Sequence, residues 1–155
     1  LHMSEPLVFM MGEFAAEFPT DRQYARNHMW ALNLSGRFRF GFSPYAVRLL
    51  QDVYFLDWTI SAPAPLQERQ EIGSIESKKA ESSLYAAISG QLTEFNEKLL
   101  ADPSAINTDK YGDGWLFEVE PAGPELPLLT PAEYIEHLDG VWKITQQTIK
   151  GQLND

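Results

Sequence analysis

The chain has 155 residues, of which 44% are hydrophobic and 12% aromatic, so it can bury one core without metals or disulfides. Its 22 acidic residues outnumber the 12 basic ones, and the net charge of −10 disfavours binding to nucleic acid or to an anionic membrane surface. It has no cysteine, which excludes disulfides, thiolate nucleophiles and cysteine metal sites and is compatible with a cytoplasmic location.

The first residues carry no clear structural signal. Leu1-His2-Met3 resembles a cloning remnant, so residues 1–2 are interpreted as a tag and Met3 as the natural start. The apolar run at residues 7–11 is shorter than a membrane span or a secretory core, and no basic segment precedes it. We therefore expect no membrane association.

Alternating patterns predict strands early in the chain. Residues 29–34 alternate large and small side chains, and residues 37–42 place three phenylalanines on one face and two arginines on the other. A Ser-Gly pair between these segments predicts a hairpin turn. Ser43 and Pro44 then predict the N-cap and first turn of a short helix that ends near Leu50.

Further strands are predicted along the middle of the chain. They cover residues 53–60, 72–75, 84–88, 91–95 and 114–120. A proline-rich break is expected at residues 62–65. Trp115, Phe117 and Val119 are expected to share one face of the last of these strands, which is more typical of a core than of a ligand site.

Helices are predicted after residue 96 and after residue 129. A short helix is expected at residues 97–101, followed by a proline-rich connector at residues 121–127. Thr130 and Glu133 form a capping box around a first-turn proline, so we expect a helix that ends at residues 139–140, and then a separate terminal helix. Many short strands with helices at the ends predict a mainly β barrel or sandwich.

The most informative segment is Ile-Glu-Ser-Lys-Lys-Ala-Glu at residues 75–81. It lies between two apolar, strand-like runs, so its two lysines are expected at the tip of a tight turn. Such a turn projects an amine into solvent while the strands hold it rigidly, which suits a lysine that becomes modified. The ordinary alternative for a Lys-Lys pair is two solvated side chains.

Several separate segments, taken together and in this order, resemble one family. They are His28-x-Trp30, Gly41-Phe42-x-x-Tyr45-Ala46, Asp52-Val53-Tyr54-Phe55, Glu76-Ser77-x-Lys79-Ala80, Glu94-Phe95-Asn96-Glu97, Ile106-Asn107, Tyr111-Gly112-x-Gly114-Trp115 and Glu133-Tyr134. Over most of its length the chain resembles the glycine cleavage system H-protein family. The resemblance implies a lipoyl-domain barrel-sandwich hybrid with short peripheral helices and a C-terminal helical segment. It divides the chain into an N-terminal extension (1–19), a carrier domain (20–140) and a helical tail (141–155).

The resemblance implies a carrier rather than an enzyme, with no catalytic residue and no metal. Lipoate would be attached covalently to Lys79, and Glu76, Ser77 and Ala80 would form the recognition motif around it, with Lys78 as an exposed neighbour. The implied partners are lipoate-attaching enzymes, aminomethyltransferase, glycine decarboxylase and dihydrolipoamide dehydrogenase. The arm would shuttle an aminomethyl group between these enzymes.

The chain departs from the family pattern where the loaded arm would be sheltered. The candidate sheltering residues are His28, Met29 and Ser83; the family has a carboxylate at the last two of these positions and often a polar residue near Leu49. Met and Leu offer no partner to a buried ammonium. The departure leaves two hypotheses: a divergent glycine-cleavage carrier, or an H-like lipoate-binding protein of sulfur oxidation that serves a heterodisulfide-reductase-like complex.

Other classes fit the residues less well. A biotin carrier would have Met on both sides of the lysine, and a lipoyl domain of a 2-oxoacid dehydrogenase would be about half as long. The histidines His2, His28 and His137 are far apart in sequence and form no catalytic pattern. Asp109 and Asp113 match no metal motif and indicate a solvated loop. A scaffold without lipoate would not need the intact motif around Lys79.

Overall fold

The computed structural model describes residues 5–154, with side chains described up to residue 147. The residues interpreted as a tag and start therefore lie outside the described part. The strands are β1 (Leu7–Met11), β2 (Phe14–Phe18), β3 (Gln23–Ala25), β4 (Met29–Leu34), β5 (Arg37–Phe42), β6 (Val53–Trp58), β7 (Ala64–Leu66), β8 (Glu71–Ser77), β9 (Glu81–Tyr85), β10 (Gly90–Phe95), β11 (Phe117–Pro121) and β12 (Leu128–Leu129). The helices are α1 (Pro44–Leu50), α2 (Lys98–Ala101), α3 (Ala105–Thr108) and α4 (Pro131–Asn154).

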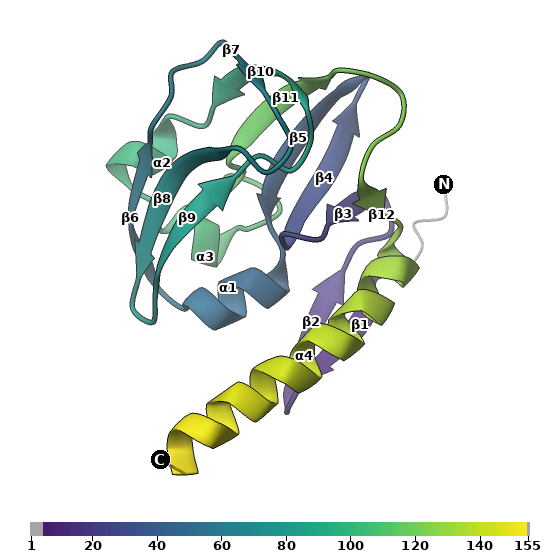
Figure 1. Cartoon of the computed structure of the whole chain (residues 1–155), viewed down its shortest axis with the longest axis vertical. Helices are drawn as coiled ribbons and strands as arrows, with labels where there is room; N and C mark the ends of the chain where they lie inside the picture. Colours follow the sequence, from purple (N-terminus) through teal and green to yellow (C-terminus); the bar gives the residue numbers. More distant parts are fainter. Residues whose placement is uncertain (1–4, 155) are drawn as a thin grey trace.

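Two antiparallel sheets enclose the main core (Figure 1). A seven-stranded sheet has the order β12-β3-β4-β5-β11-β10-β7, and a three-stranded sheet has the order β6-β8-β9. Fully buried Phe40, Ile72 and Phe117 lie in the core that the sheets share, with the rings of Phe40 and Phe117 stacked at 5.2 Å. The predicted mainly β fold, with helices at the periphery, is confirmed.

The predicted hairpin of β4 and β5 is confirmed. The three phenylalanines of β5 are buried, whereas Arg39 on the opposite face pairs with the carboxylate of Glu118 on β11 at 2.7 Å. Ser43 caps α1 through a 3.5 Å hydrogen bond from the backbone N–H of Ala46, and Pro44 stands in the first turn.

Two strand predictions need correction. The proline-rich stretch predicted as a break at residues 62–65 overlaps the start of β7, which pairs with β10. Trp115 was predicted within a strand, but β11 begins at Phe117. The N–H of Trp115 instead bonds to Gly112 in a turn, and its ring covers the guanidinium of Arg39 at 4.4 Å. It therefore does not share a face with Phe117 and Val119.

The strand predicted at residues 84–88 is also displaced. The structure places β9 at residues 81–85, directly after the lysine turn, because pairing with β8 starts at the turn itself. Residues 86–88 are buried outside any strand, which explains why their apolar pattern looked strand-like.

Helix α4 is continuous where the sequence predicts a stop. The capping box is confirmed, because Glu133 accepts the N–H of Thr130 and Thr130 accepts that of Glu133. The predicted end at residues 139–140 and the separate terminal helix are wrong. A glycine stop needs a left-handed backbone, and Gly140 lacks a positive φ. Past the glycine, Trp142 packs edge-on against Tyr45 at 6.2 Å, so the apolar face continues.

The N-terminal residues form a hairpin that packs with α4 on a second cluster of buried side chains (Figure 1). The cluster contains Phe9, Met11, Ala16, Phe18, Tyr24, Trp30, Tyr45, Leu129, Tyr134 and Leu138. The sequence did not predict β1 and β2 as strands. Their inward-facing apolar residues alternate with exposed ones, which is the pattern of a half-buried hairpin.

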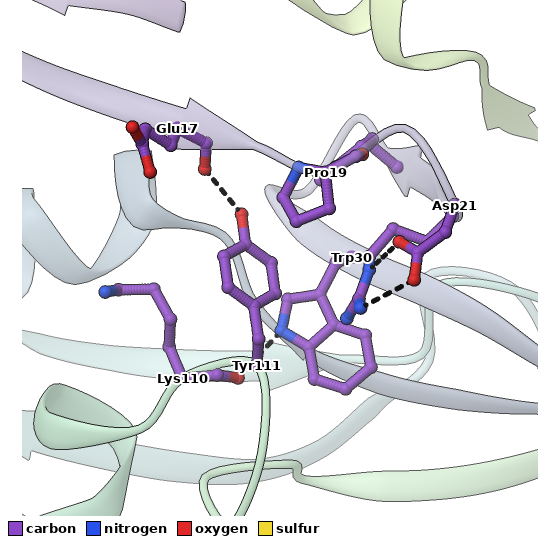
Figure 2. A network of polar contacts seen from close by, with 8 residues as sticks. Glu17, Pro19, Asp21, Trp30, Lys110 and Tyr111 are labelled. Carbon is purple, nitrogen blue, oxygen red and sulfur yellow. Dashed lines mark hydrogen bonds and ion pairs between the residues drawn. The ribbon is translucent and has the colours of Figure 1, made fainter. Parts of the chain in front are cut away.

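A hydrogen bond joins this hairpin to the barrel, and a second one lies beside it within the barrel, as Figure 2 shows. The hydroxyl of Tyr111 donates to the carbonyl of Glu17 at 2.9 Å, and the indole N–H of Trp30 donates to the carbonyl of Lys110, also at 2.9 Å. The guanidinium of Arg22 lies over both the Trp30 and the Tyr111 ring, 5.0 and 4.8 Å from their centroids. Trp30 can pack here because Gly41 has no side chain; a Cβ at that position would overlap the indole.

Among residues 5–154, no helix has both the length and the apolar character needed to cross a membrane.

Candidate functional site

The two adjacent lysines lie at the tip of the hairpin formed by β8 and β9, as the sequence predicts. Glu76 pairs with Glu81 in the register of the hairpin, so the chain reverses through residues 77–80. Lys78, Lys79 and Ala80 are all exposed there. The hairpin tip therefore presents both amines to solvent from a paired, two-stranded support.

Ser77 organises the turn. Its side chain is buried, and its hydroxyl accepts the backbone N–H of Ala80 at 3.1 Å and of Lys79 at 3.3 Å. The same hydroxyl donates to the carbonyl of Ala80 at 3.2 Å, and the backbone N–H of Ser77 donates to that carbonyl at 2.9 Å. These bonds hold the backbone of Lys79 in one place while its side chain remains free.

The tip of the hairpin is bonded to the short loop that follows α1. The backbone N–H of Lys78 donates to the carbonyl of Asp52 at 2.8 Å. Asn107 holds this connection from the other side, since its amide donates to Gln51 and accepts the N–H of Val53 at 2.6 and 2.9 Å. The Ile-Asn segment noted in the sequence thus supports the loop beside the lysine hairpin.

A pair of carboxyl groups lies just behind the tip. Glu76 and Glu81 face each other across the hairpin, and their shared hydrogen bond favours the protonated form, so the pKa of Glu76 is raised above its ordinary value. The two line a shallow hollow on the hairpin together with Ser74 and two serines of β9. This hollow is an acidic surface directly behind the lysine turn.

A second cavity, of about 210 Å³, lies between β4, α1 and β9. His28 and Met29 line it from the start of β4, Leu49 from α1, and Ser83 from β9. The structure thus brings together all three residues predicted to shelter the arm, with the leucine that departs from the family pattern. Sequence reasoning missed Asn27, whose amide donates to the carbonyl of Tyr85 at 3.3 Å beside the cavity; its only signal was its place next to His28.

His28 is held within a buried polar cluster. Its Nδ1 is hydrogen-bonded to the hydroxyl of Tyr134 at 2.8 Å, and that hydroxyl is 2.9 Å from the hydroxyl of buried Ser43. Burial, helped by the charge of His137, lowers the pKa of His28 to about 4, so its ring is neutral at pH 7. The rings of His28 and His137 stack at 5.9 Å, a proximity that their distance in sequence does not reveal.

Of the other residues considered in the sequence, Asp109 and Asp113 line neither the cavity nor the hollow beside the lysine hairpin. The carboxylate of Asp109 accepts the backbone N–H of Asp113 at 2.9 Å and so closes a turn. His2 lies outside the described residues. Among residues 5–154, no group of three or more His, Asp and Glu side chains could hold a metal ion.

Comparison with known proteins identifies relatives of this architecture. The family model for the glycine cleavage H-protein matches residues 22–139. A glycine cleavage system H protein of Rubrobacter xylanophilus is 38% identical over 124 residues, which cover 80% of this chain and 97% of that protein. Another, from Halorhodospira halophila, is 38% identical over 108 residues, 69% of this chain and 82% of that protein.

A solved structure agrees with these matches. The crystal structure of a glycine cleavage system H protein from Mycobacterium marinum superposes with a TM-score of 0.68 at 35% identity, over 76% of this chain and 95% of that one. The relatives named here are all glycine-cleavage proteins, so they give no support to the sulfur-oxidation hypothesis.

Proposed function

The chain belongs to the glycine cleavage H-protein family, and from this premise we propose that it is a carrier rather than an enzyme, with lipoate in amide linkage to the Nζ of Lys79. In this role it delivers an aminomethyl group between glycine decarboxylase and aminomethyltransferase. Lipoate-attaching enzymes and dihydrolipoamide dehydrogenase are its further partners, and the cytoplasm is the proposed location.

The observation that carries this proposal is the exposed Lys79 on a fixed backbone. A carrier needs a lysine whose amine reaches partner active sites while its support stays rigid. The bonds from Ser77 supply that support, and the side chain of Lys79 is exposed at the tip of the hairpin. Lys78 is equally exposed, but its backbone N–H donates to the carbonyl of Asp52, after α1, rather than to Ser77.

The residues present suit a lipoyl group. When bound, it supplies a dithiolane that can be reduced and can carry a group on sulfur. The absence of cysteine leaves no protein thiol to exchange with that dithiolane. Attachment to the hairpin also makes each transfer effectively intramolecular, which raises the local concentration of the arm at a docked partner.

Intact mass spectrometry of the chain made in a lipoylating host tests the proposal. We expect one lipoyl mass on the wild type and on Lys78→Arg, and none on Lys79→Arg, because Arg cannot form the amide. Incubation with glycine decarboxylase and glycine should then add an aminomethyl mass to the lipoylated forms. A wild type without any lipoyl mass would refute the carrier role, and a lipoyl mass that persists in Lys79→Arg would move the site to Lys78.

A further inference from the structure

A groove lies at the edge of the three-stranded sheet, away from the lysine hairpin. It has a volume of about 700 Å³ and lies between the end of β6, the end of β10 and α2, which packs beside β6 (Figure 1). Trp58 in the groove pairs with Gly73, whereas Val53 pairs with Ser77 next to the lysines. The 6 residues of β6 therefore separate the groove from the hairpin tip, by roughly 15–20 Å at about 3.3 Å a residue.

Three aromatic side chains line the groove, and each is partly exposed. The rings of Trp58 and Phe95 stack at 4.2 Å with 16° between their planes, and Trp58 meets the core residue Phe117 edge-on at 6.1 Å. Trp115 is the third aromatic residue of the lining. The side-chain amide of buried Asn96 donates to the carbonyl of Trp115 at 2.8 Å and fixes the backbone there. The groove thus offers preformed ring surfaces to a ligand.

The groove also carries an excess of negative charge. Its charged lining residues, all of them exposed, are Asp57, Glu94, Glu97 and Lys98. In the part of the chain that the structure describes, none of the three carboxylates forms an ion pair. Within residues 5–154, no group of three or more acidic or histidine side chains could hold a metal ion. The charge of the groove therefore suits an extended organic cation rather than an inorganic one.

An arginine side chain matches this lining better than a lysine does. A guanidinium is planar, so it can stack on an aromatic ring while its edge donates two hydrogen bonds to a carboxylate. The chain makes the same kind of contact itself, because the guanidinium of Arg39 covers the ring of Trp115 at 4.4 Å while it pairs with Glu118 at 2.7 Å. An apolar residue next to the arginine would contact Leu100, which lines the groove and is 51% exposed.

A buried donor in the groove favours a peptide as the ligand. The indole N–H of Trp58 is buried and has no hydrogen-bond partner among the described residues. An unpaired buried donor is unfavourable, and a backbone carbonyl of a docked peptide would relieve this cost. A simple amine has no such acceptor to offer.

We propose that this groove docks an arginine-bearing segment of a partner protein. The inference rests on the proposed function in so far as the partner is an enzyme that the carrier visits. The guanidinium stacks on the aromatic rings and pairs with a carboxylate, and a neighbouring apolar residue covers Leu100. The partner then holds the chain at the groove and leaves the arm on the hairpin free to enter its active site. The net charge of −10 favours the approach of a basic segment.

A titration of the unlipoylated chain, followed by the NMR signals of its indole N–H groups, tests the docking. The probe is the peptide acetyl-Leu-Arg-Leu-Arg-Gly-amide, and the matched peptide has citrulline, which is neutral and similar in shape, in place of each arginine. Trp58→Phe assigns the Trp58 signal. We expect a saturable shift of this signal with the arginine peptide and binding of the citrulline peptide that is weaker by roughly tenfold or more. Equal affinities, or no saturable shift at millimolar peptide, would overturn the proposal.

A matched pair of double variants locates the binding. Glu94→Gln with Glu97→Gln removes two carboxylates from the groove, whereas Glu125→Gln with Glu136→Gln removes two exposed carboxylates outside it. The two double variants change the net charge equally. We expect the first to weaken binding of the arginine peptide by about tenfold, and the second by less than about twofold. Equal losses would show that the peptide responds to net charge alone, which contradicts a groove that recognises it.

Kinetics of the proposed partner enzymes with the lipoylated chain test whether the groove serves one of them. For that enzyme, the groove variant should raise the KM for the carrier by about fivefold or more with kcat unchanged, because docking precedes the chemical step. The control variant should leave both constants as in the wild type. Peptide binding without a change in any partner's KM would overturn the docking role. A chain that gains no lipoyl mass refutes the carrier role instead, and the peptide titration still decides what the groove binds.

Discussion

The buried hydroxyl of Ser77 sets the backbone geometry of the turn that holds Lys79. Ser77 makes three side-chain hydrogen bonds within the turn, to Lys79 and to both backbone groups of Ala80. It is the buried member of an otherwise exposed tip. The serine of the predicted recognition motif thus has a structural role in the turn, independent of any enzyme that recognises it.

Ser77→Ala is expected to loosen the lysine turn. The loss of these bonds should cost about 0.5–1.5 kcal/mol of stability, because water can replace part of them at the exposed tip. Lipoylation of Lys79 should also slow. Urea unfolding and the initial lipoylation rate measure the two effects. Ser82→Ala is the control, since its hydroxyl bonds only to the exposed carbonyl of Ser83. Equal rates for both variants would contradict this role of Ser77.

At the scale of elements, α4 shows how packing overrides a local stop signal. Its Asp-Gly pair is followed by another turn of apolar contacts, and the hydroxyl of Thr145 lies 3.1 Å from that of Tyr45 on α1. A Cβ added at Gly140 would meet nothing within 4 Å. The helix therefore continues through the glycine at a conformational cost that its contacts offset.

Gly140→Ala is therefore expected to stabilise the protein by about 0.5–1 kcal/mol, because alanine loses less backbone entropy in a helix. Gly36→Ala is the opposing control, since Gly36 has a φ of +98° in a turn and the substitution should destabilise. Denaturant titration of the wild type and the two variants measures the change in the free energy of unfolding, which should rise for Gly140→Ala and fall for Gly36→Ala. A destabilised Gly140→Ala variant would mean that the helix ends at the glycine, as the sequence alone suggests.

At the scale of the whole molecule, there is a second hydrophobic cluster besides the core that the two sheets share. There the N-terminal hairpin, α4 and the start of β4 meet around Tyr134 and Phe18. The guanidinium of Arg48 on α1 also lies over the ring of Phe14 at 4.4 Å. The N-terminal hairpin therefore contacts the helix that lines the cavity. The division into extension, carrier domain and tail stays a prediction, and these contacts couple the three segments.

Phe18→Ala tests this coupling. Its ring is fully buried and contacts Tyr24 and Tyr134 at 5.7 and 5.5 Å, so truncation should cost about 3–5 kcal/mol through lost contacts and the remaining cavity. Val8→Ala on the exposed face of β1 should change stability by less than about 0.5 kcal/mol. In Phe18→Ala, tryptophan fluorescence and circular dichroism should report a single unfolding transition with a lower midpoint than in the wild type. A separate minor transition, with the main midpoint unchanged, would mean that the hairpin is independent of the barrel.

Local chemistry made some features predictable from the sequence alone. The lysine turn, the β4–β5 hairpin and the capping box at Thr130 each depend on residues a few positions apart, so their side-chain types suffice to indicate the backbone. The prediction that Lys79 is the modified residue came from the resemblance of a short motif around it to the family pattern, and it stays a prediction. Alternation of apolar residues likewise predicted a mainly β fold.

Tertiary structure decided what depends on segments distant in the chain. The cavity exists only because β4, α1 and β9 pack together, which turns Met29, Leu49 and Ser83 into one uncharged wall. The stacking of His28 on His137 and the continuation of α4 past Gly140 arise from the second cluster in the same way. The sequence thus determined where the arm is expected, because a turn is set by its own residues. Packing decided which side chains line the cavity beside that turn, because the cavity is formed by segments that are distant in the chain.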